Sequence, residues 1–110
     1  MALAATFDPA LAERFGRVIG QEGLALNQDV LLSPMVNIVR VPLAGRNFET
    51  FGEDPLLASR MVAAEVRGVQ AEGLIATVKH YVANNFENNR RGVDAQVPER
   101  ALGTPAARSR

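Results

Sequence analysis

The chain has 110 residues, which is enough for one small domain with a core of its own. Its 12 basic and 12 acidic residues balance, so there is no net charge to attract nucleic acid or an anionic membrane surface. Hydrophobic residues form 47% of the chain, which excludes a disordered protein, and no apolar run reaches the roughly 18 residues of a membrane span. The absence of cysteine excludes disulfides and thiolate ligands, and it leaves the compartment open.

A first helix is expected to start at Asp8. The Asp8–Pro9 pair is typical of a helix start, because the carboxylate can accept hydrogen bonds from the first turn and proline suits the first helical position. One apolar helix face follows, made of Leu11, Phe15, Val18 and Ile19. Gly16 and Gly20 are four residues apart and predict a flat, closely packed face, and Gly23 is expected to end the helix in a left-handed conformation.

Residues 29–33 are expected to form a strand buried on both faces, as in a parallel sheet, because the apolar run 30–32 is bounded by polar residues and Pro34. The extended chain can continue over residues 35–41. Residues 42–54 show neither a helical nor a strand period. A connection of that length is uncommon inside a compact domain and is usually functional.

The second helix is expected from Asp54–Pro55 to about Glu72, with Gly73 as its cap. Its apolar stripe consists of Leu57, Met61 and Ala64, with Ala58, Val62, Val66 and Val69 beside it. Residues 74–78 are mostly β-branched or apolar and predict a second strand. Lys79 and His80 follow directly at the carboxyl end of that strand.

A second long polar loop is expected over residues 81–97, followed by the start of a helix at residues 97–102 and a tail without period at 103–110. Helices and buried strands therefore alternate, which predicts an α/β fold of parallel βα units. In such folds ligands gather at the carboxyl ends of the strands, on the loops that follow. Both polar clusters, at residues 45–55 and 79–81, are expected at that edge, where they would form one wall of a polar pocket.

Several motifs together resemble the N-terminal (β/α)8 domain of family 3 glycoside hydrolases, most closely its β-glucosidase-like branch. The matching segments are Leu-Ser-Pro-Met-Val-Asn-Ile (32–38), Gly-Arg-Asn-Phe-Glu (45–49) with Glu-Asp-Pro (53–55), Lys-His-Tyr (79–81) with Asn84, Asn85, Glu87 and Arg90, and Glu-Arg-Ala-Leu (99–102). Several long motifs in the right order are far more specific than one short pattern. The resemblance covers residues 1–102 as part of that domain, and residues 103–110 do not match it.

The resemblance implies a fragment of a TIM barrel, with about two to three βα units of parallel strands and flanking helices. It also implies part of a retaining O-glycosyl hydrolase whose Asp nucleophile and separate acid/base carboxylate both lie outside this chain. We therefore expect no catalytic residue here and no hydrolysis by the chain alone. A full barrel takes about 250 residues, so apolar edges of strand and helix are expected to stay uncovered.

Arg46, Lys79 and His80 match family positions that hydrogen-bond the hydroxyls of the sugar ring, and Arg90 matches a further basic residue lining the same site. The resemblance thus implies a β-glucoside or similar sugar as partner. Sugar hydroxyls both donate and accept, and the cationic heads of arginine and lysine are strong donors. No cofactor is expected, and one histidine without cysteine does not make a metal ligand set.

The charged residues also have structural interpretations. Arg46 can pair with Glu49 or Asp54, and we expect Glu49 to orient Arg46 and Asp54 to cap the helix, in preference to a catalytic carboxylate pair. A lone histidine such as His80 is often only a structural hydrogen-bonding group. Arg90 can belong to a solvated loop. The remaining polar and aromatic residues are expected to brace their loops through side-chain-to-backbone bonds (Asn84, Asn85) or to pack locally (Phe48, Phe51, Phe86).

A second functional hypothesis stays open. The chain can be a non-catalytic carbohydrate-binding or interaction fragment that folds only with a complementary chain. Residues 1–6 are apolar, short and without a basic region, so we expect no signal peptide. For a longer parent protein, a cytoplasmic or a periplasmic location both remain possible. A phosphate-binding module is a weaker hypothesis, since neither loop has a glycine-rich phosphate cradle.

Overall fold

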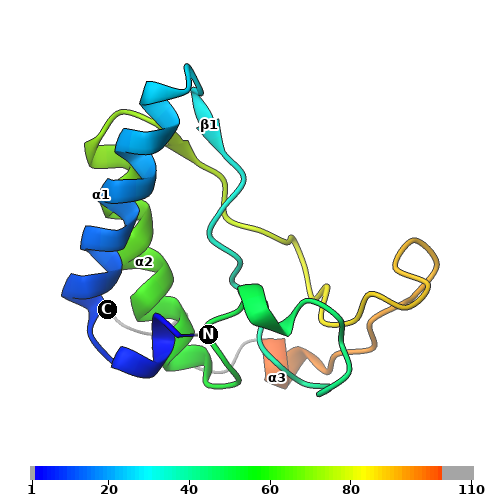
Figure 1. The fold of residues 1–110 in the computed structure, drawn as a ribbon. Coiled ribbons are helices and arrows are strands. Elements are labelled where there is room, and N and C mark those ends of the chain that lie inside the picture. Colours follow the sequence, from blue (N-terminus) through cyan, green and yellow to red (C-terminus); the bar gives the residue numbers. More distant parts are fainter. Residues whose placement is uncertain (1, 103–110) are drawn as a thin grey trace.

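The computed structural model describes residues 2–102, and the tail expected at residues 103–110 lies outside the described part. In chain order the elements are η1 (Ala4–Thr6), α1 (Pro9–Ala25), β1 (Val30–Leu31), η2 (Asn47–Glu49), α2 (Pro55–Ala71), β2 (Ile75–Ala76) and α3 (Glu99–Leu102). The two long helices lie side by side, and both strands run from the same end of this pair toward the long loops (Figure 1). The α/β arrangement with parallel strands and flanking helices is confirmed.

Both long helices begin where the sequence predicts. The Asp8 carboxylate accepts hydrogen bonds from the backbone N–H groups of Ala10 and Leu11. The Asp54 carboxylate does the same for the first turn of α2. Each cap satisfies donors that the first turn of a helix otherwise leaves without a partner. The expected cap at Gly73 is also confirmed, since this residue follows α2 with a φ of 102°.

The expected end of α1 at Gly23 is wrong. The helix continues to Ala25, and Asn27 adopts the left-handed conformation with a φ of 54°. A Cβ atom at Gly23 would lie 2.5 Å from Cδ2 of Leu74. Gly23 thus makes room for a side chain that comes from the second strand region. A glycine needed for close packing and a glycine needed for a cap look alike in a sequence.

Helices α1 and α2 pack through glycine, as Gly16 and Gly20 predicted. A Cβ atom at Gly16 would lie 2.3 Å from the backbone oxygen of Glu65, and one at Gly68 would lie 2.1 Å from that of Glu13. The two backbones therefore touch. The buried residues of α1 are Ala12, Gly16 and Gly20. The bulky side chains of Phe15 and Val18, on the apolar face that the sequence indicated, are 43% and 51% exposed.

The strands pair in parallel, with Val30 opposite Ile75 and Leu31 opposite Ala76. A further parallel bridge joins Met35 to Lys79. The sequence separation between paired residues is therefore one residue shorter at this bridge than in the strands. The peptide bonds Ser33–Pro34, Lys79–His80 and Tyr81–Val82 are cis. This pairing leads both strand segments to the same end of the sheet, where the two long loops begin.

The expectation that residues 29–33 are buried on both faces is wrong for this structure. The regular strand covers only Val30–Leu31, and Val30, Leu32 and Ile75 are 46%, 67% and 61% exposed. Alternate side chains of a strand point to opposite faces, and helix α2 packs against β2 on one of them. The open apolar face agrees with the expected uncovered barrel edges.

The core lies between α2, η1, the first turn of α1 and the segment before α2. Its buried members are Ala4, Ala12, Phe51, Ala58, Met61, Val62 and Ala64. The predicted stripe of α2 is therefore confirmed, and so is the packing role of Phe51. Phe48 lies outside this core and is 72% exposed. No helix within residues 2–102 is both long and apolar enough to cross a bilayer.

Candidate functional site

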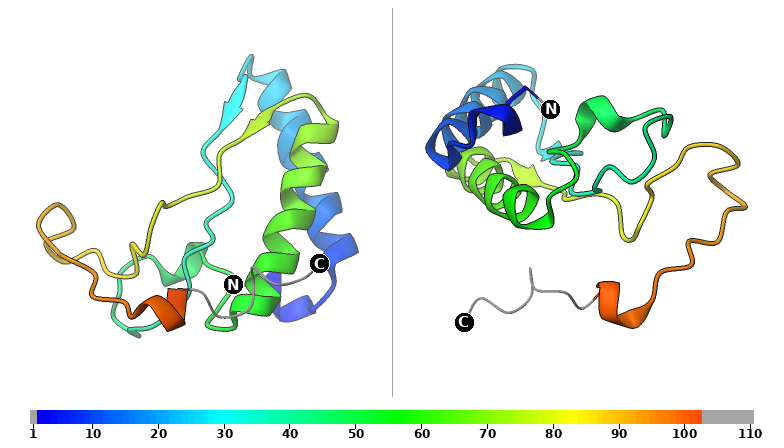
Figure 2. Two further views of the ribbon diagram at one scale, coloured as in Figure 1. Left: turned by 180° about the vertical axis from the view of Figure 1, so that it is seen from behind. Right: turned by 90° about the horizontal axis from the view of Figure 1, so that it is seen from below.

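The two long loops meet at the carboxyl ends of the strands. The backbone N–H of Glu87 donates to the carbonyl oxygen of Ala44 at 3.2 Å. Both loops lie toward the end of the helix pair opposite to the one where the strands begin, as the views in Figure 1 and Figure 2 show. This contact brings Arg46, from the first loop, within 3.3 Å of Nε2 of His80, which follows β2. The juxtaposition that the sequence predicted for the two polar clusters is therefore present.

Glu49 holds Arg46 and Lys79 together. Its two carboxylate oxygens accept from Nε of Arg46 at 2.6 Å and from Nη2 at 2.9 Å, a bidentate pair. Oε2 also lies 3.2 Å from Nζ of Lys79. The hydrogen bond from Arg46, with further help from Lys79, lowers the pKa of Glu49 to about 2. Glu49 is thus the ionised residue that orients Arg46, as expected, while Asp54 caps α2.

Glu87 is a second anionic centre, which the sequence interpretation did not single out. Its Oε1 accepts from Nη1 of Arg46 at 3.3 Å and from Nδ2 of Asn84 at 3.0 Å, and its Oε2 lies 3.6 Å from Nη1 of Arg90. Desolvation opposes ionisation, but the hydrogen bond from Asn84 and the charges of Arg90 and Arg46 outweigh it and lower the pKa of Glu87. The signals in the sequence were its place in a segment that matches the family and its position three residues before Arg90.

His80 is held from both sides. The side-chain oxygen of Asn37 lies 2.9 Å from the backbone nitrogen of His80 and 2.9 Å from its Nδ1, and Nε2 faces Arg46. Burial, followed by the positive charges of Arg46, Arg90 and Lys79, lowers the pKa of His80. Asn37 is itself buried, at 6% exposed. The sequence placed Asn37 in a matching motif without assigning it a role.

The asparagines of the second loop brace it, but by a different kind of bond than expected. Nδ2 of Asn84 donates to Glu87, and Oδ1 of Asn85 accepts from Nδ2 of Asn37 at 3.3 Å. These are side-chain-to-side-chain bonds, whereas side-chain-to-backbone bonds were expected. The difference arises because the second loop folds back onto charged and buried polar groups, which offer the amides stronger partners than the loop backbone does.

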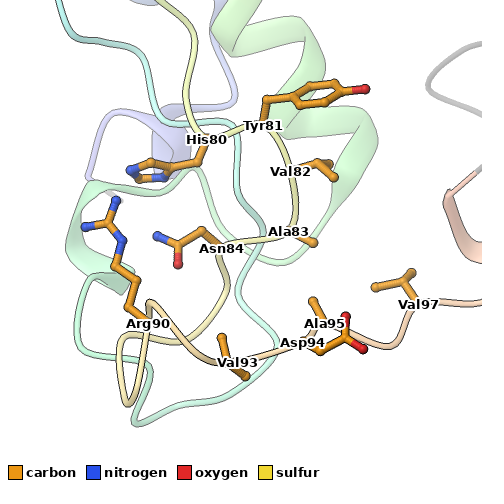
Figure 3. A pocket seen from close by; sticks show the side chains of 10 residues that line it. All are labelled: His80, Tyr81, Val82, Ala83, Asn84, Arg90, Val93, Asp94, Ala95 and Val97. Carbon is orange, nitrogen blue, oxygen red and sulfur yellow. The ribbon is translucent and has the colours of Figure 1, made fainter.

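An open cavity of about 520 Å³ lies beside this cluster and is lined by His80, Tyr81, Val82, Ala83, Asn84, Arg90, Val93, Asp94, Ala95 and Val97. His80, Asn84 and Arg90 point toward a common space in it, whereas the ring of Tyr81 points away (Figure 3). Of the predicted site residues, His80 and Arg90 line this cavity. Arg46 lines a small adjoining hollow, and Lys79 reaches Arg46 through Glu49.

The cluster is a dense set of donors with two fixed carboxylates. Arg46, Lys79 and Arg90 carry positive charge, and Glu49 and Glu87 offset part of it. Within residues 2–102 there is no group of three or more histidine, cysteine, aspartate or glutamate side chains that could hold a metal ion. Such a set of donors can hydrogen-bond a ligand rich in hydroxyl groups. Both carboxylates are already engaged by cations, so neither is available as a proton donor near neutral pH.

Comparison with known proteins places these residues in a family. Residues 1–105 match the Glycosyl hydrolase family 3 N terminal domain. The chain is 51% identical over 100 residues to beta-glucosidase BoGH3A of Bacteroides ovatus, an alignment that covers 91% of this chain and 13% of that protein. It is 47% identical over 100 residues to a beta-glucosidase of Kluyveromyces marxianus, with 91% of this chain and 12% of that protein covered.

A solved structure shows the same arrangement. The crystal structure of DesR, a beta-glucosidase from Streptomyces venezuelae in complex with D-glucose, superposes with a TM-score of 0.91 at 54% identity. That match covers 93% of this chain and 13% of DesR. The chain thus spans only about an eighth of the length of these relatives. With a family match over residues 1–105, the chain belongs to the N-terminal domain family of the family 3 glycosyl hydrolases.

Proposed function

We propose that this chain supplies the glycone-binding wall of a retaining β-glucosidase, with Arg46, Lys79, His80 and Arg90 as the sugar-binding residues. The observation that carries the proposal is the convergence of these four side chains, through Glu49 and Glu87, at the carboxyl ends of two neighbouring parallel strands. Ligands of parallel-barrel enzymes bind at that end. The names of the relatives, and the glucose bound to DesR, support a β-glucoside as substrate.

The chemistry of the cluster suits a sugar. A guanidinium presents planar donors that stay charged at any physiological pH, and an ammonium presents a compact head with three donors. Contacts to a ring hydroxyl that tighten as the oxocarbenium ion forms would also help catalysis. Glu49 and Glu87 keep these donors aimed by pairing with them on the protein side.

Hydrolysis needs two further carboxylates, a nucleophile and an acid/base residue. In this chain Glu49 and Glu87 are engaged with cations, and their lowered pKa values make both poor proton donors. We therefore assign the chain a binding role and place the catalytic pair outside it. The purified chain should release no chromophore from a chromogenic β-glucoside, and clear turnover would refute this division of labour.

Sugar binding has its own test. Titration of the purified chain with D-glucose, followed by NMR, should show binding that Arg90→Ala weakens about tenfold, as expected when a charged hydrogen bond is lost. Arg91→Ala is the matched control, because it removes the neighbouring exposed arginine of the same loop. Equal affinities for the two variants would count against Arg90 as a ligand, and no binding by the unsubstituted chain would count against the site.

The second candidate is a carbohydrate-binding or interaction fragment that folds only with a complementary chain. The open apolar face at Val30, Leu32 and Ile75 favours it, because such a face is usually covered in a barrel. Reading the encoding DNA beyond the codon of Leu102, in all frames, would discriminate the two. A following strand that carries an aspartate nucleophile supports the β-glucosidase; its absence supports the separate fragment. A sharp cooperative melt of the isolated chain would contradict dependence on a partner.

A further inference from the structure

Asn37 and His80 form the least expected contact of the site. They are 43 residues apart, and a single oxygen of Asn37 lies 2.9 Å from two nitrogens of His80, the backbone N and the ring Nδ1. The backbone N–H can only donate. The Asn37 atom that faces it is therefore the carbonyl oxygen, and this orients the whole amide. The Nδ2 group of Asn37 then donates to Oδ1 of Asn85 at 3.3 Å, in agreement with that orientation.

The orientation of Asn37 decides the protonation of the ring. An amide oxygen can only accept, so Nδ1 of His80 must carry the proton that it shares with Asn37. On the opposite side of the ring, Nε2 lies 3.3 Å from Nη1 of Arg46, which is always a donor. A second proton on Nε2 would set two donors against each other. Two obligate donors and one oriented amide thus leave His80 neutral, with the lone pair on Nε2 as the acceptor that faces Arg46.

We propose that Asn37 is a positioning residue that holds His80 as the Nδ1–H tautomer, so that Nε2 accepts a hydrogen bond from a hydroxyl of the bound sugar. The part that concerns the sugar rests on the proposed function. The part that concerns the tautomer stands on the contacts of Asn37 and Arg46 alone. His80 thus offers the ligand an acceptor, and the sugar hydroxyl would take the place of the Arg46 hydrogen at Nε2.

The acceptor role of Nε2 restricts which ligand groups can bind between His80 and Arg46. Nη1 of Arg46 carries two hydrogens, of which one is directed to Glu87 at 3.3 Å and the other to His80. A ligand group that enters here must accept from Arg46 and donate to Nε2 of His80. A hydroxyl does both, whereas a fluorine, an ether oxygen or a carboxylate can only accept. The site should therefore require a free hydroxyl at one ring position.

The other charged groups around the ring agree with a neutral His80. Arg46, Arg90 and Lys79 are cations, and Glu87 is the one carboxylate that acts on the ring in the opposite sense. Burial and the cations outweigh Glu87 and lower the pKa of His80. At neutral pH the ring therefore has one proton, and Asn37 determines which nitrogen carries it.

The tautomer can be read directly, because His80 is the only histidine of the chain. Nitrogen-15 NMR of the histidine-labelled chain distinguishes a protonated from an unprotonated ring nitrogen. At neutral pH the spectrum should show a protonated Nδ1 and an unprotonated Nε2. A protonated Nε2, or the same averaged signals as in the urea-denatured chain, would overturn the assignment.

Two substitutions test the role of Asn37. Asn37→Ala removes the oxygen and should shift the ring toward the Nε2–H form, whereas Asn37→Asp keeps an acceptor and should retain the Nδ1–H form with a raised His80 pKa. The exposed Asn88 provides the control, and Asn88→Ala should leave the spectrum unchanged. If Asn37→Ala unfolds the chain, Asn37→Asp still decides: loss of the Nδ1–H pattern in that variant would refute the positioning role.

The final arm tests the ligand. D-glucose and its monodeoxyfluoro analogues are titrated into the same labelled chain. The analogue in which fluorine replaces the hydroxyl that donates to Nε2 of His80 should bind roughly tenfold more weakly than glucose, because fluorine cannot donate. If every analogue binds as well as glucose, the acceptor role is wrong. If glucose does not bind while the nitrogen spectrum shows Nδ1–H, the proposed sugar site fails and the assignment of Asn37 stands.

Discussion

Replacing Glu49 with glutamine should disconnect Arg46 from Lys79. The Glu49 carboxylate forms a bidentate pair with Arg46 and lies 3.2 Å from Nζ of Lys79. Glutamine keeps the size of the side chain but removes the charge, and its amide nitrogen would face a guanidinium or ammonium group as a second donor. Two cations would then lose their common partner.

The size of the effect follows from the pKa. The pKa of Glu49 is about 2 in the fold, against 4.5 for the unperturbed carboxyl, because of the hydrogen bond from Arg46. At ~1.4 kcal/mol per pKa unit, the difference between 4.5 and about 2 corresponds to at most about 3.5 kcal/mol of folding free energy. The side chain is 23% exposed, so solvent screening reduces our expectation to about 1–2 kcal/mol. Since folding lowers the pKa, the stabilisation is present above pH ~4.5 and is lost as the pH falls toward 2.

The assay is urea unfolding of the chain and of Glu49→Gln, near pH 7 and again near pH 3. The difference in unfolding free energy should be about 1–2 kcal/mol near pH 7 and smaller near pH 3. Glu53→Gln is the matched control, because Glu53 is an exposed carboxylate of the same loop. Equal stability of Glu49→Gln and Glu53→Gln near pH 7, or an NMR titration of Glu49 near 4.5, would refute this role of Glu49.

Three further predictions concern the scaffold. Gly68→Ala should destabilise the chain by about 1–3 kcal/mol in urea unfolding, because the added methyl would lie 2.1 Å from a backbone oxygen of α1; Gln70→Ala, on the exposed side of α2, is the control and should change little. Asp54→Ala should cost about 1 kcal/mol by the same assay, through loss of the α2 cap, and an unchanged midpoint would argue against that cap. Burial raises the pKa of Glu65, so its contribution to stability is present at low pH and is lost as the pH rises through that pKa. Glu65→Gln should therefore gain stability relative to the unsubstituted chain between about pH 4 and 7, and a constant difference over that range would contradict the raised pKa.

The helix boundaries show what local signals can predict. Asp8 and Asp54 start their helices because a cap bonds to N–H groups only two and three residues away. Gly73 ends α2 for a similarly local reason, its positive φ. Gly23 was misassigned because its actual role, making room for Leu74, depends on a residue of the second strand region. The helix boundaries set by contacts within a few residues were predicted correctly, whereas the role of Gly23, which depends on the distant Leu74, was not.

The candidate site divides in the same way. Arg46, Lys79 and His80 were predicted as partners because they follow strands or match family motifs, and the structure brings them together. Asn37 and Glu87 received no functional role, although each holds a predicted residue. Their partners are distant in sequence: Glu87 is 41 residues from Arg46, and Asn37 is 43 residues from His80. No periodicity or spacing connects residues so far apart.

The amino-acid sequence alone is enough to predict the helix starts, the alternation of helix and strand, and the position of the polar residues after the strands. Each of these depends on hydrogen bonds and hydrophobic period within one segment. The parallel register, the exposure of Val30 and Leu32, and the contacts of the His80 ring follow from tertiary contacts alone. Those features depend on which distant groups meet when the chain closes loops of some forty residues, and each group is then constrained by its neighbour's chemistry.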